Sequence, residues 1–217
     1  RIETVKLPMM QTMKCVVLAI SASLMSVSVA AAERIEGRVE VGGVPISGAA
    51  VSVWLAGPSA PQQLAKTQSN ANGNYDLSFA EVKDYAGVLY LLAEGGEAKQ
   101  ATVKGPNPAI TLMANLGSEP PERVTINELT TVASVWTSAQ FLNGSALSGN
   151  ALGLRIAAGN VPNLVNLETG GLGAVIMDPL NSSQTTTLAK LNTLGILLTA
   201  CVTAKQDACS KLFAAAT

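Results

Sequence analysis

The chain of 217 residues contains no histidine, which removes several classes of catalytic site. Ser-His-Asp and Cys-His hydrolases need an imidazole as their general base, and many zinc sites need a histidine ligand. A serine enzyme can use a lysine base instead, but the spacing Ser-x-x-Lys occurs nowhere in the sequence. The sequence therefore predicts a protein that is not an enzyme and that has no metal site and no cofactor.

The first 32 residues have the pattern of a leader. After the upstream residues "RIETVKLPM", the run "KCVVLAISASLMSVSVAAAE" has one positive charge, a short apolar part and small residues before a cleavage point, here placed after Ala32. This pattern predicts a secretory signal peptide. A transmembrane anchor is the alternative, but four serines dilute the apolar part, and a spanning helix needs roughly 20 apolar residues. We expect a secreted, cell-surface or periplasmic protein without a membrane span.

Few charges and few cysteines remain after such a cleavage. The mature chain would carry 11 basic and 14 acidic residues with no basic stripe, so we expect no nucleic-acid partner. Its two cysteines would be Cys201 and Cys209, in a compartment where disulfides persist, and we expect them to be bonded. A metal pair or a nucleophile is the alternative, and both lack the usual partner residues.

Residues 33–116 have the alternation of short β-strands. In residues 34–41, "RIEGRVEV", charged residues alternate with apolar residues or glycine, as a half-buried strand requires. Residues 49–55 continue this alternation after the turn "GGVPISG". Further candidates are residues 63–68, 74–79, 87–93, 99–103 and 109–114. The spacing predicts a seven-stranded antiparallel β-sandwich or barrel.

These residues resemble the carboxypeptidase regulatory-like family, a prealbumin-like sandwich, over residues 34–115. The pattern has Gly-x-Val, a Gly-x-Pro-hydrophobic-x-Gly-Ala turn, Val-x-Val, a Thr, and an Asn-x-x-Gly-x-Tyr turn. It is filled by Gly37, Val39, Gly43, Pro45, Ile46, Gly48, Ala49, Val51, Val53, Thr67, Asn70, Gly73 and Tyr75. The resemblance implies a noncatalytic accessory domain of a secreted or surface protein; Pro45 and Gly48 are interpreted as turn residues.

The stretch "TQSNANGNYDLSF", residues 67–79, allows three interpretations: a calcium loop, a ligand-binding tip or a turn between strands. A helix-loop-helix calcium site needs acidic ligands, whereas alignment on Gly73 places Asn70 and Asn72 at ligand positions and Phe79 at the final glutamate position. Asparagine and glycine both adopt turn conformations readily. We predict a strand-connecting turn.

Residues 117–122 are predicted to be a linker, and residues 123–217 a small helical domain that is cut from a longer chain. Thr125 and Glu128 have the spacing of a capping box ahead of a helix. A second helix is expected at residues 147–158, ended or kinked by Pro162. The remaining predictions are an apolar helix at residues 187–203, packed inside a bundle, and a last helix at 208–216 capped by Asp207. This part resembles an uncharacterised helical region of bacterial secreted proteins.

The sequence offers three further candidate sites: a glycine-rich stretch, a set of acidic residues and a tryptophan. The glycine-rich residues 169–179 lack a phosphate-binding spacing and are interpreted as a connection. A two-carboxylate glycoside hydrolase, the remote alternative, would draw on Glu128, Glu168, Asp178 and Asp207. Trp54 is out of phase with the buried residues of its strand, so it either stacks on a sugar ring or, as the favoured role, covers the other face of the sheet or contacts the helical half.

The fold class expected is therefore α+β in more than one domain: an N-terminal sandwich and a C-terminal helical part. The function expected is a noncatalytic structural or binding module outside the cytoplasm of a bacterium. The alternative is a carbohydrate-binding or adhesive accessory domain. Its partner would be an envelope polysaccharide or another domain of a longer chain.

Overall fold

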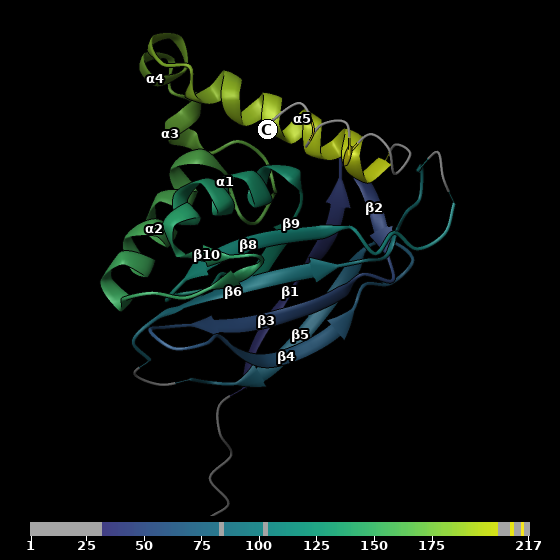
Figure 1. Cartoon of the computed structure of the whole chain (residues 1–217), viewed down its shortest axis with the longest axis vertical. Helices are drawn as coiled ribbons and strands as arrows, with labels where there is room; N and C mark the ends of the chain where they lie inside the picture. The colour runs from purple at the N-terminus through teal and green to yellow at the C-terminus, as the bar shows by residue number, and fades with distance from the viewer. Residues whose placement is uncertain (1–31, 83–84, 102–103, 204–208, 211–213, 215–217) are drawn as a thin grey trace, which may run out of the picture.

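The computed structural model describes residues 32–82, 85–101, 104–203, 209–210 and 214 (Figure 1). It is a mixed structure of strands and helices, in which two β-sheets carry the helices along one side. The predicted signal peptide, apart from Ala32, and the predicted cap at Asp207 lie outside the described residues.

The first sheet has five strands built around β1. The strand β1 (Ala32–Val41) pairs antiparallel with β5 (Asn74–Ala80) and with β2 (Val44–Ser47), which pairs antiparallel with β7 (Glu97–Ala98). The fifth strand, β9 (Arg123–Ile126), runs parallel to β1. Gly37 makes this pairing possible, because a Cβ atom there would lie 1.8 Å from the carbonyl oxygen of Val124.

The second sheet has four antiparallel strands in the order β4 (Gln62–Gln68), β3 (Ala50–Ala56), β6 (Val88–Glu94) and β8 (Thr111–Gly117). Alternate residues of the two sheets point toward each other and share one buried core. Ile35, Val39 and Leu77 enter it from the first sheet, and Val51 and Leu91 from the second. Burial of these alternating residues is the main force that holds the two sheets together.

The strand count differs from the sequence prediction. The two sheets have nine strands among the described residues, not seven, and one pairing is parallel. Three strands were not predicted, and all are short: β2 and β9 have four residues each and β7 has two. Residues 99–101 of the predicted strand 99–103 are not in a strand, because pairing in this region is limited to β7.

The helices follow β9 directly: α1 (Glu128–Ser138), the 3-10 helix η1 (Ala139–Phe141), α2 (Ala151–Leu164), α3 (Ala174–Met177), α4 (Pro179–Gln184) and α5 (Thr187–Thr203). A small hairpin of β10 (Leu142–Asn143) and β11 (Ala146–Leu147) precedes α2. Helices α1 and α2 lie against β8, and α5 lies along α1 (Figure 1). None of the helices in the described part of the chain combines the length and apolar character needed to cross a bilayer.

The start of α1 corrects the predicted capping box. The N-cap is Asn127, whose side chain accepts a hydrogen bond from the Thr130 amide, while the Thr130 hydroxyl accepts one from the Asn127 amide. Thr125 instead belongs to β9, and its hydroxyl donates to the carbonyl of Glu168. The N-cap therefore lies two residues later than predicted, because Thr125 is part of strand β9.

Two other helix predictions also differ from the structure. Helix α2 continues to Leu164 and includes Pro162 in its last turn, so the proline does not end the helix where it occurs. Helix α5 has the predicted bounds but is not enclosed in a bundle: Ile196 is 69% exposed, whereas Leu191 and Val202 are buried. One side of α5 faces the protein and the other faces solvent.

A row of hydroxyl groups on α1, here called the hydroxyl row, covers the edge of β8. The members are Thr131, Ser134 and Ser138, and all are buried. The Met113 amide donates to Thr131 Oγ1 at 2.9 Å, and the Asn115 amide donates to Ser134 Oγ at 2.8 Å. Ser138 accepts from the side-chain amide of Asn115. These side chains thus occupy the positions that the carbonyl groups of a neighbouring strand would fill.

Candidate functional site

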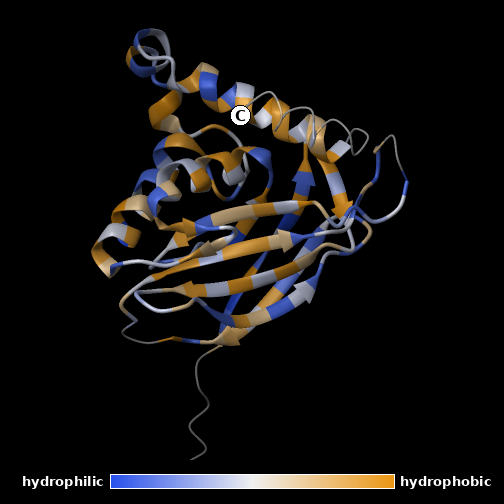
Figure 2. Cartoon of the chain, in the orientation of Figure 1, coloured by the Kyte–Doolittle hydropathy of each residue, from blue (hydrophilic) through white to orange (hydrophobic). Residues whose placement is uncertain are grey.

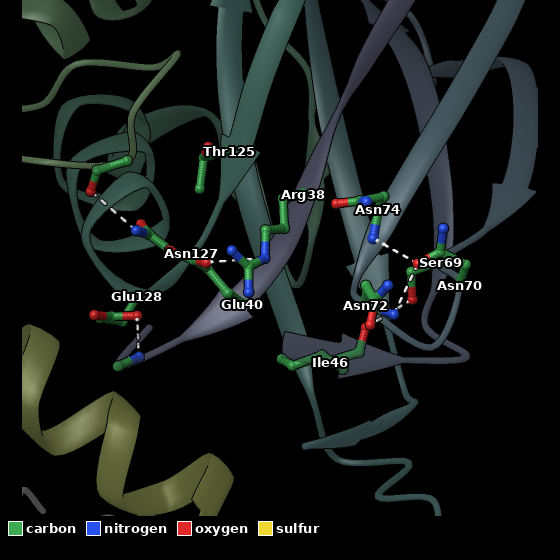
Figure 3. A network of polar contacts seen from close by, with 12 residues as sticks. Arg38, Glu40, Ile46, Ser69, Asn70, Asn72, Asn74, Thr125, Asn127 and Glu128 are labelled. Carbon is green, nitrogen blue, oxygen red and sulfur yellow. Dashed lines mark hydrogen bonds and ion pairs between the residues drawn. The ribbon is translucent and has the colours of Figure 1, made fainter. Parts of the chain in front are cut away.

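The asparagine-rich stretch is a turn between β4 and β5 (Figure 3). The side-chain oxygen of Asn70 accepts hydrogen bonds from the amides of Asn72 and Asn74, at 2.8 and 3.1 Å. Gly73 has φ +78, and its amide donates to the Asn70 carbonyl. A Cβ atom at Gly73 would lie 2.5 Å from the carbonyl oxygen of Val39, so the close approach to β1 also requires glycine.

The neighbouring turn residues are also engaged within the fold. Ser69 is buried; its hydroxyl donates to the Ile46 carbonyl and accepts from the Ala49 amide. Pro45 lies in β2, and Gly48 has φ +71 between β2 and β3. In the described residues, no group of three or more Cys, Asp or Glu is placed to hold a metal ion. The side-chain oxygen of Asn70 therefore stabilises the backbone of the turn, whereas that of Asn72 accepts from the Lys99 ammonium group.

Trp54 lies on the outer face of β3, under the hairpin that precedes α2. Its ring stacks on Tyr90 with centroids 6.4 Å apart, and its indole nitrogen donates to the Ser52 hydroxyl. It packs beside Phe141 and Leu142 against a second buried cluster that includes Leu154 of α2. The indole is partly buried. Of its predicted roles, this position corresponds to covering the outer face of the sheet and contacting the helical part.

The described acids of the predicted hydrolase lie in different parts of the structure. Glu128 accepts a hydrogen bond from the Gly42 amide in the β1–β2 turn, at 3.0 Å (Figure 3). Asp178 caps α4 through the Leu180 amide. Glu168 lies in the connection after α2, where its carbonyl accepts from Thr125. Asp207, the fourth acid, is outside the described residues. The two carboxylates with known contacts bind backbone amides in different parts of the fold.

The glycine-rich connection is attached to the start of α1. The side-chain amide of Asn127 donates to the Gly170 carbonyl at 2.9 Å, and Gly170 has φ +71. A side chain at Gly170 would collide with Asn127, since a Cβ atom would lie 2.4 Å from its amide nitrogen. The connection therefore holds the N-cap residue Asn127 in place. The sequence had predicted a connection between helices and no such contact.

Cys201 and Cys209 are close together as free thiols. Burial, together with a hydrogen bond to Cys201, raises the pKa of the Cys209 thiol to about 11. At neutral pH the Cys209 thiol is therefore protonated, and a protonated thiol is a poor nucleophile. The disulfide itself stays a prediction.

Sequence reasoning missed two surfaces, and the first is the outer face of the five-stranded sheet. Arg34 forms an ion pair with Asp76 at 2.7 Å, Arg123 pairs with Glu36, and Arg38 pairs with Glu40 (Figure 3 shows the last pair). Two open pockets of about 570 and 370 Å³ lie on this face, and both are lined by Glu36 and Arg123. The alternation of charges along β1 was the signal that could have indicated this surface.

The hydrogen bond to Arg34 lowers the pKa of Asp76, and the same bond raises the pKa of Arg34. At the end of β1, burial and then the charge of Glu81 raise the pKa of Glu33. Burial, with the charges of Glu33 and Glu119, raises the pKa of Tyr85 to about 12. Tyr75 is buried beneath the face and donates to the Val124 carbonyl, and this burial raises its pKa far above the ordinary value. The shifts of Arg34, Asp76, Tyr75 and Tyr85 favour the form that each group already has at neutral pH.

The second missed surface is an apolar groove of about 870 Å³ between α1, α5 and the segment before β8. Its walls include Ile110, Val132, Trp136, Leu194, Leu198 and Cys209. No charged side chain of the described residues lines it. Trp136 is 40% exposed and Leu194 is 45% exposed, so part of this apolar surface is open to solvent. The signal was the surplus of apolar residues on α5, which the sequence analysis assigned to a buried helix.

No protein-family model matches the sequence, and no curated protein matches it either. Among solved structures, part of the chain is similar to a 9R-lipoxygenase from Cyanothece PCC8801, with 14% identity and a TM-score of 0.28. The similarity covers 44% of this chain and 15% of the lipoxygenase chain. A TM-score this low carries no argument about fold or activity.

Proposed function

We propose that the chain is a noncatalytic structural module of a bacterial envelope or secreted protein. One observation carries the proposal: three of the polar side chains at the candidate sites bind the backbone of the fold. Asn70 binds two backbone amides, Glu128 binds the β1–β2 turn, and Asp178 caps α4. Side chains that satisfy the backbone in this way hold the structure and are not free to act on a substrate.

The resemblance to the carboxypeptidase regulatory-like family agrees with this role. The positions shared with that pattern include Gly37, Gly48 and Gly73, and in each case the local geometry explains the glycine, through a close backbone contact or a positive φ. In this proposal, two sheets form a prealbumin-like sandwich to which the helical part is joined. A fold of this kind does not by itself confer an activity.

The test of the noncatalytic role is an assay of the full chain on glycosidic substrates. We expect no turnover. Turnover that is lost in Glu128→Gln, while the folded structure is retained by circular dichroism, would overturn the proposal in favour of a two-carboxylate hydrolase. A matched control is Glu97→Gln, whose carboxylate likewise accepts from a backbone amide, that of Gly105.

A carbohydrate-binding role is the second candidate, and the two pockets on the outer face of the five-stranded sheet favour it. Their linings include the hydrogen-bonding side chains of Glu36, Arg38, Asn74 and Arg123, which suit sugar hydroxyl groups. Titration with envelope polysaccharides would test it by calorimetry. Saturable binding that is lost in Arg123→Ala and kept in Trp54→Phe would support this surface, whereas no saturable binding would reject it.

The proposed location outside the cytoplasm follows from the leader pattern and the predicted disulfide between Cys201 and Cys209. Expression of the full reading frame in a bacterium, followed by fractionation, would test the location. Mass spectrometry of the exported protein should show a new N-terminus near Glu33 and a bond between Cys201 and Cys209. Retention in the cytoplasm with an intact leader would overturn this part of the proposal.

A further inference from the structure

The outer face of the five-stranded sheet carries two neighbouring rows of polar side chains, and the first is here called the paired row. Its members Asp76, Glu36 and Arg123 lie side by side on β5, β1 and β9. Asp76 forms an ion pair with Arg34, and Glu36 forms ion pairs with both Arg34 and Arg123. The two acids balance the two arginines, so this row has no spare charge.

The second row, here called the donor row, leaves hydrogen-bond donors free. Its members Asn74, Arg38 and Thr125 lie side by side on the same three strands (Figure 3). The ion pair of Arg38 with Glu40 is closest at Nε, which lies 3.2 Å from Oε2. Among the described residues, the terminal nitrogens of Arg38 and the side-chain amide of Asn74 donate no hydrogen bond. These donors are available to a ligand.

The smaller of the two pockets on this face lies over the donor row. It has a volume of about 370 Å³, and its charged lining residues are Arg38, Arg123 and Glu36. The larger pocket is lined by three acids and two arginines: Glu33, Glu36, Glu122, Arg34 and Arg123. An anionic group therefore fits the smaller pocket, where the cationic side chains are in excess.

The described residues that line the two pockets include no exposed aromatic ring. Their one aromatic residue is Tyr75, which is 4% exposed and donates its hydroxyl proton to the Val124 carbonyl. Without a ring on which a sugar can stack, affinity must come from hydrogen bonds and charge. A guanidinium group binds a carboxylate through two parallel hydrogen bonds. A sugar that carries a carboxylate therefore suits this surface better than a neutral sugar.

We propose that the smaller pocket binds the carboxylate group of an acidic polysaccharide. The terminal nitrogens of Arg38 bind the two carboxylate oxygens, and the Asn74 amide is a further donor. The larger pocket, which shares Glu36 and Arg123 with the smaller one, takes the hydroxyl groups of a neighbouring sugar. This inference rests on the carbohydrate-binding role given above as the second candidate, and it adds the class of sugar.

The experiment is a calorimetric titration of the full chain with an oligomer of galacturonic acid and with its methyl ester, which has the same rings and no charge. We expect the ester to bind at least about tenfold more weakly, because it loses the charged hydrogen bonds to Arg38. Equal binding of acid and ester would overturn the inference and leave the carbohydrate-binding role standing. Binding of neither would reject both.

Arg38→Gln tests whether the smaller pocket is the site. Binding of the acid should weaken about tenfold or more, while binding of the ester should stay the same. Arg155→Gln is the matched control, because it removes the same charge from an exposed residue of α2 and should leave the affinity unchanged. Arg38→Lys keeps the charge without the paired nitrogens and should give an intermediate affinity. Full affinity in Arg38→Gln would overturn the inference.

Asn74→Asp keeps the test informative if Arg38→Gln fails to fold. The new carboxylate would compete with the ligand for Arg38, so binding of the acid should be lost, and retained binding would contradict the proposed site. Dextran sulfate distinguishes a carboxylate site from attraction to any polyanion. Binding of dextran sulfate as tight as that of the galacturonic acid oligomer would overturn the inference.

Discussion

The outer faces of the two sheets differ sharply, although both sheets arise from the same alternation in sequence. On the five-stranded sheet, the outward residues of β1 are Arg34, Glu36, Arg38 and Glu40, and all four take part in ion pairs that are exposed or partly buried. On the four-stranded sheet, the outward residues include Trp54, Tyr90 and Met113, and helices cover them. Figure 2 shows β1 mainly as hydrophilic and β6 mainly as hydrophobic.

This difference explains why the helical part and the sheets form one structure. The covered face has its own apolar cluster, to which α2 contributes Leu154 and Ala158. The hydroxyl row then satisfies the amides at the edge of β8. A sheet with a second apolar face requires a partner layer, whereas a sheet with a charged outer face is complete without one.

The largest effect is expected on the covered face. Leu154→Ala should lower the free energy of unfolding by about 2–5 kcal/mol, because it removes a side chain with 0% exposure from the cluster against β6 and β8. Urea denaturation measures the change. Leu152→Ala on the same helix is the control: Leu152 is 69% exposed, so its effect should stay below about 0.5 kcal/mol. Equal effects of the two variants would contradict burial of α2 on the sheet.

The hydroxyl row should give an intermediate effect. Ser134→Ala leaves the buried Asn115 amide without its acceptor, which should cost about 1–3 kcal/mol. Hydrogen exchange should show faster exchange at Asn115 in particular. Thr137→Val is the control, because the Thr137 hydroxyl donates only to the Ser134 carbonyl within α1. If protection of the Asn115 amide is unchanged in Ser134→Ala, the row does not cover the edge.

The charged face should respond more weakly. Asp76→Asn removes the exposed partner of Arg34, so the melting temperature should fall less than in Ser134→Ala, and the difference should shrink at high salt. Because the folded pKa of Asp76 is lowered, its contribution is present above the unfolded pKa and is lost as pH falls through the folded value. Melting curves at several pH values should therefore converge for variant and wild type in acid. If the melting temperatures of variant and wild type still differ in acid, the effect of Asp76→Asn does not come from the ion pair.

The smallest effect is expected at Glu33, the one acid of β1 in phase with the inward residues. Its folded pKa is raised, so its contribution to stability is fully present below the unfolded value near 4.5 and is lost as pH rises through the folded value. Glu33→Gln should therefore raise the melting temperature slightly at neutral pH and leave it unchanged in acid. A lower melting temperature at neutral pH would show that the charged form is stabilised instead.

The longer strands were predictable from sequence because alternation requires no knowledge of partners. Residues 34–41 and 74–79 fall within β1 and β5. The short strands β2 and β9 were not predictable, because four residues carry little periodicity. The pairing of β9 with β1 also joins segments far apart in sequence. The same long-range pairing placed Thr125 in a strand and moved the helix cap to Asn127. The predicted linker at residues 117–122 stays a prediction, although β9 beyond it joins the first sheet.

Single-residue predictions depended on whether the local sequence determines the environment. The turn at Asn70 and Gly73 was predictable, since its hydrogen bonds are local. The surroundings of Trp54 and the exposed side of α5 were not, because both depend on helices placed by tertiary packing. The apolar content of α5 alone does not distinguish a buried helix from one that borders a groove.

The hydroxyl row also bears on self-association. With α1 removed, the amides of Met113 and Asn115 would lie along a bare edge of β8, next to a wide apolar face. Such an edge is a template on which a strand from another molecule can pair, and repeated pairing leads to aggregates. Helix α1 therefore blocks edge-to-edge pairing of the sheet with other molecules. A fragment that ends before Glu128 would lose that protection.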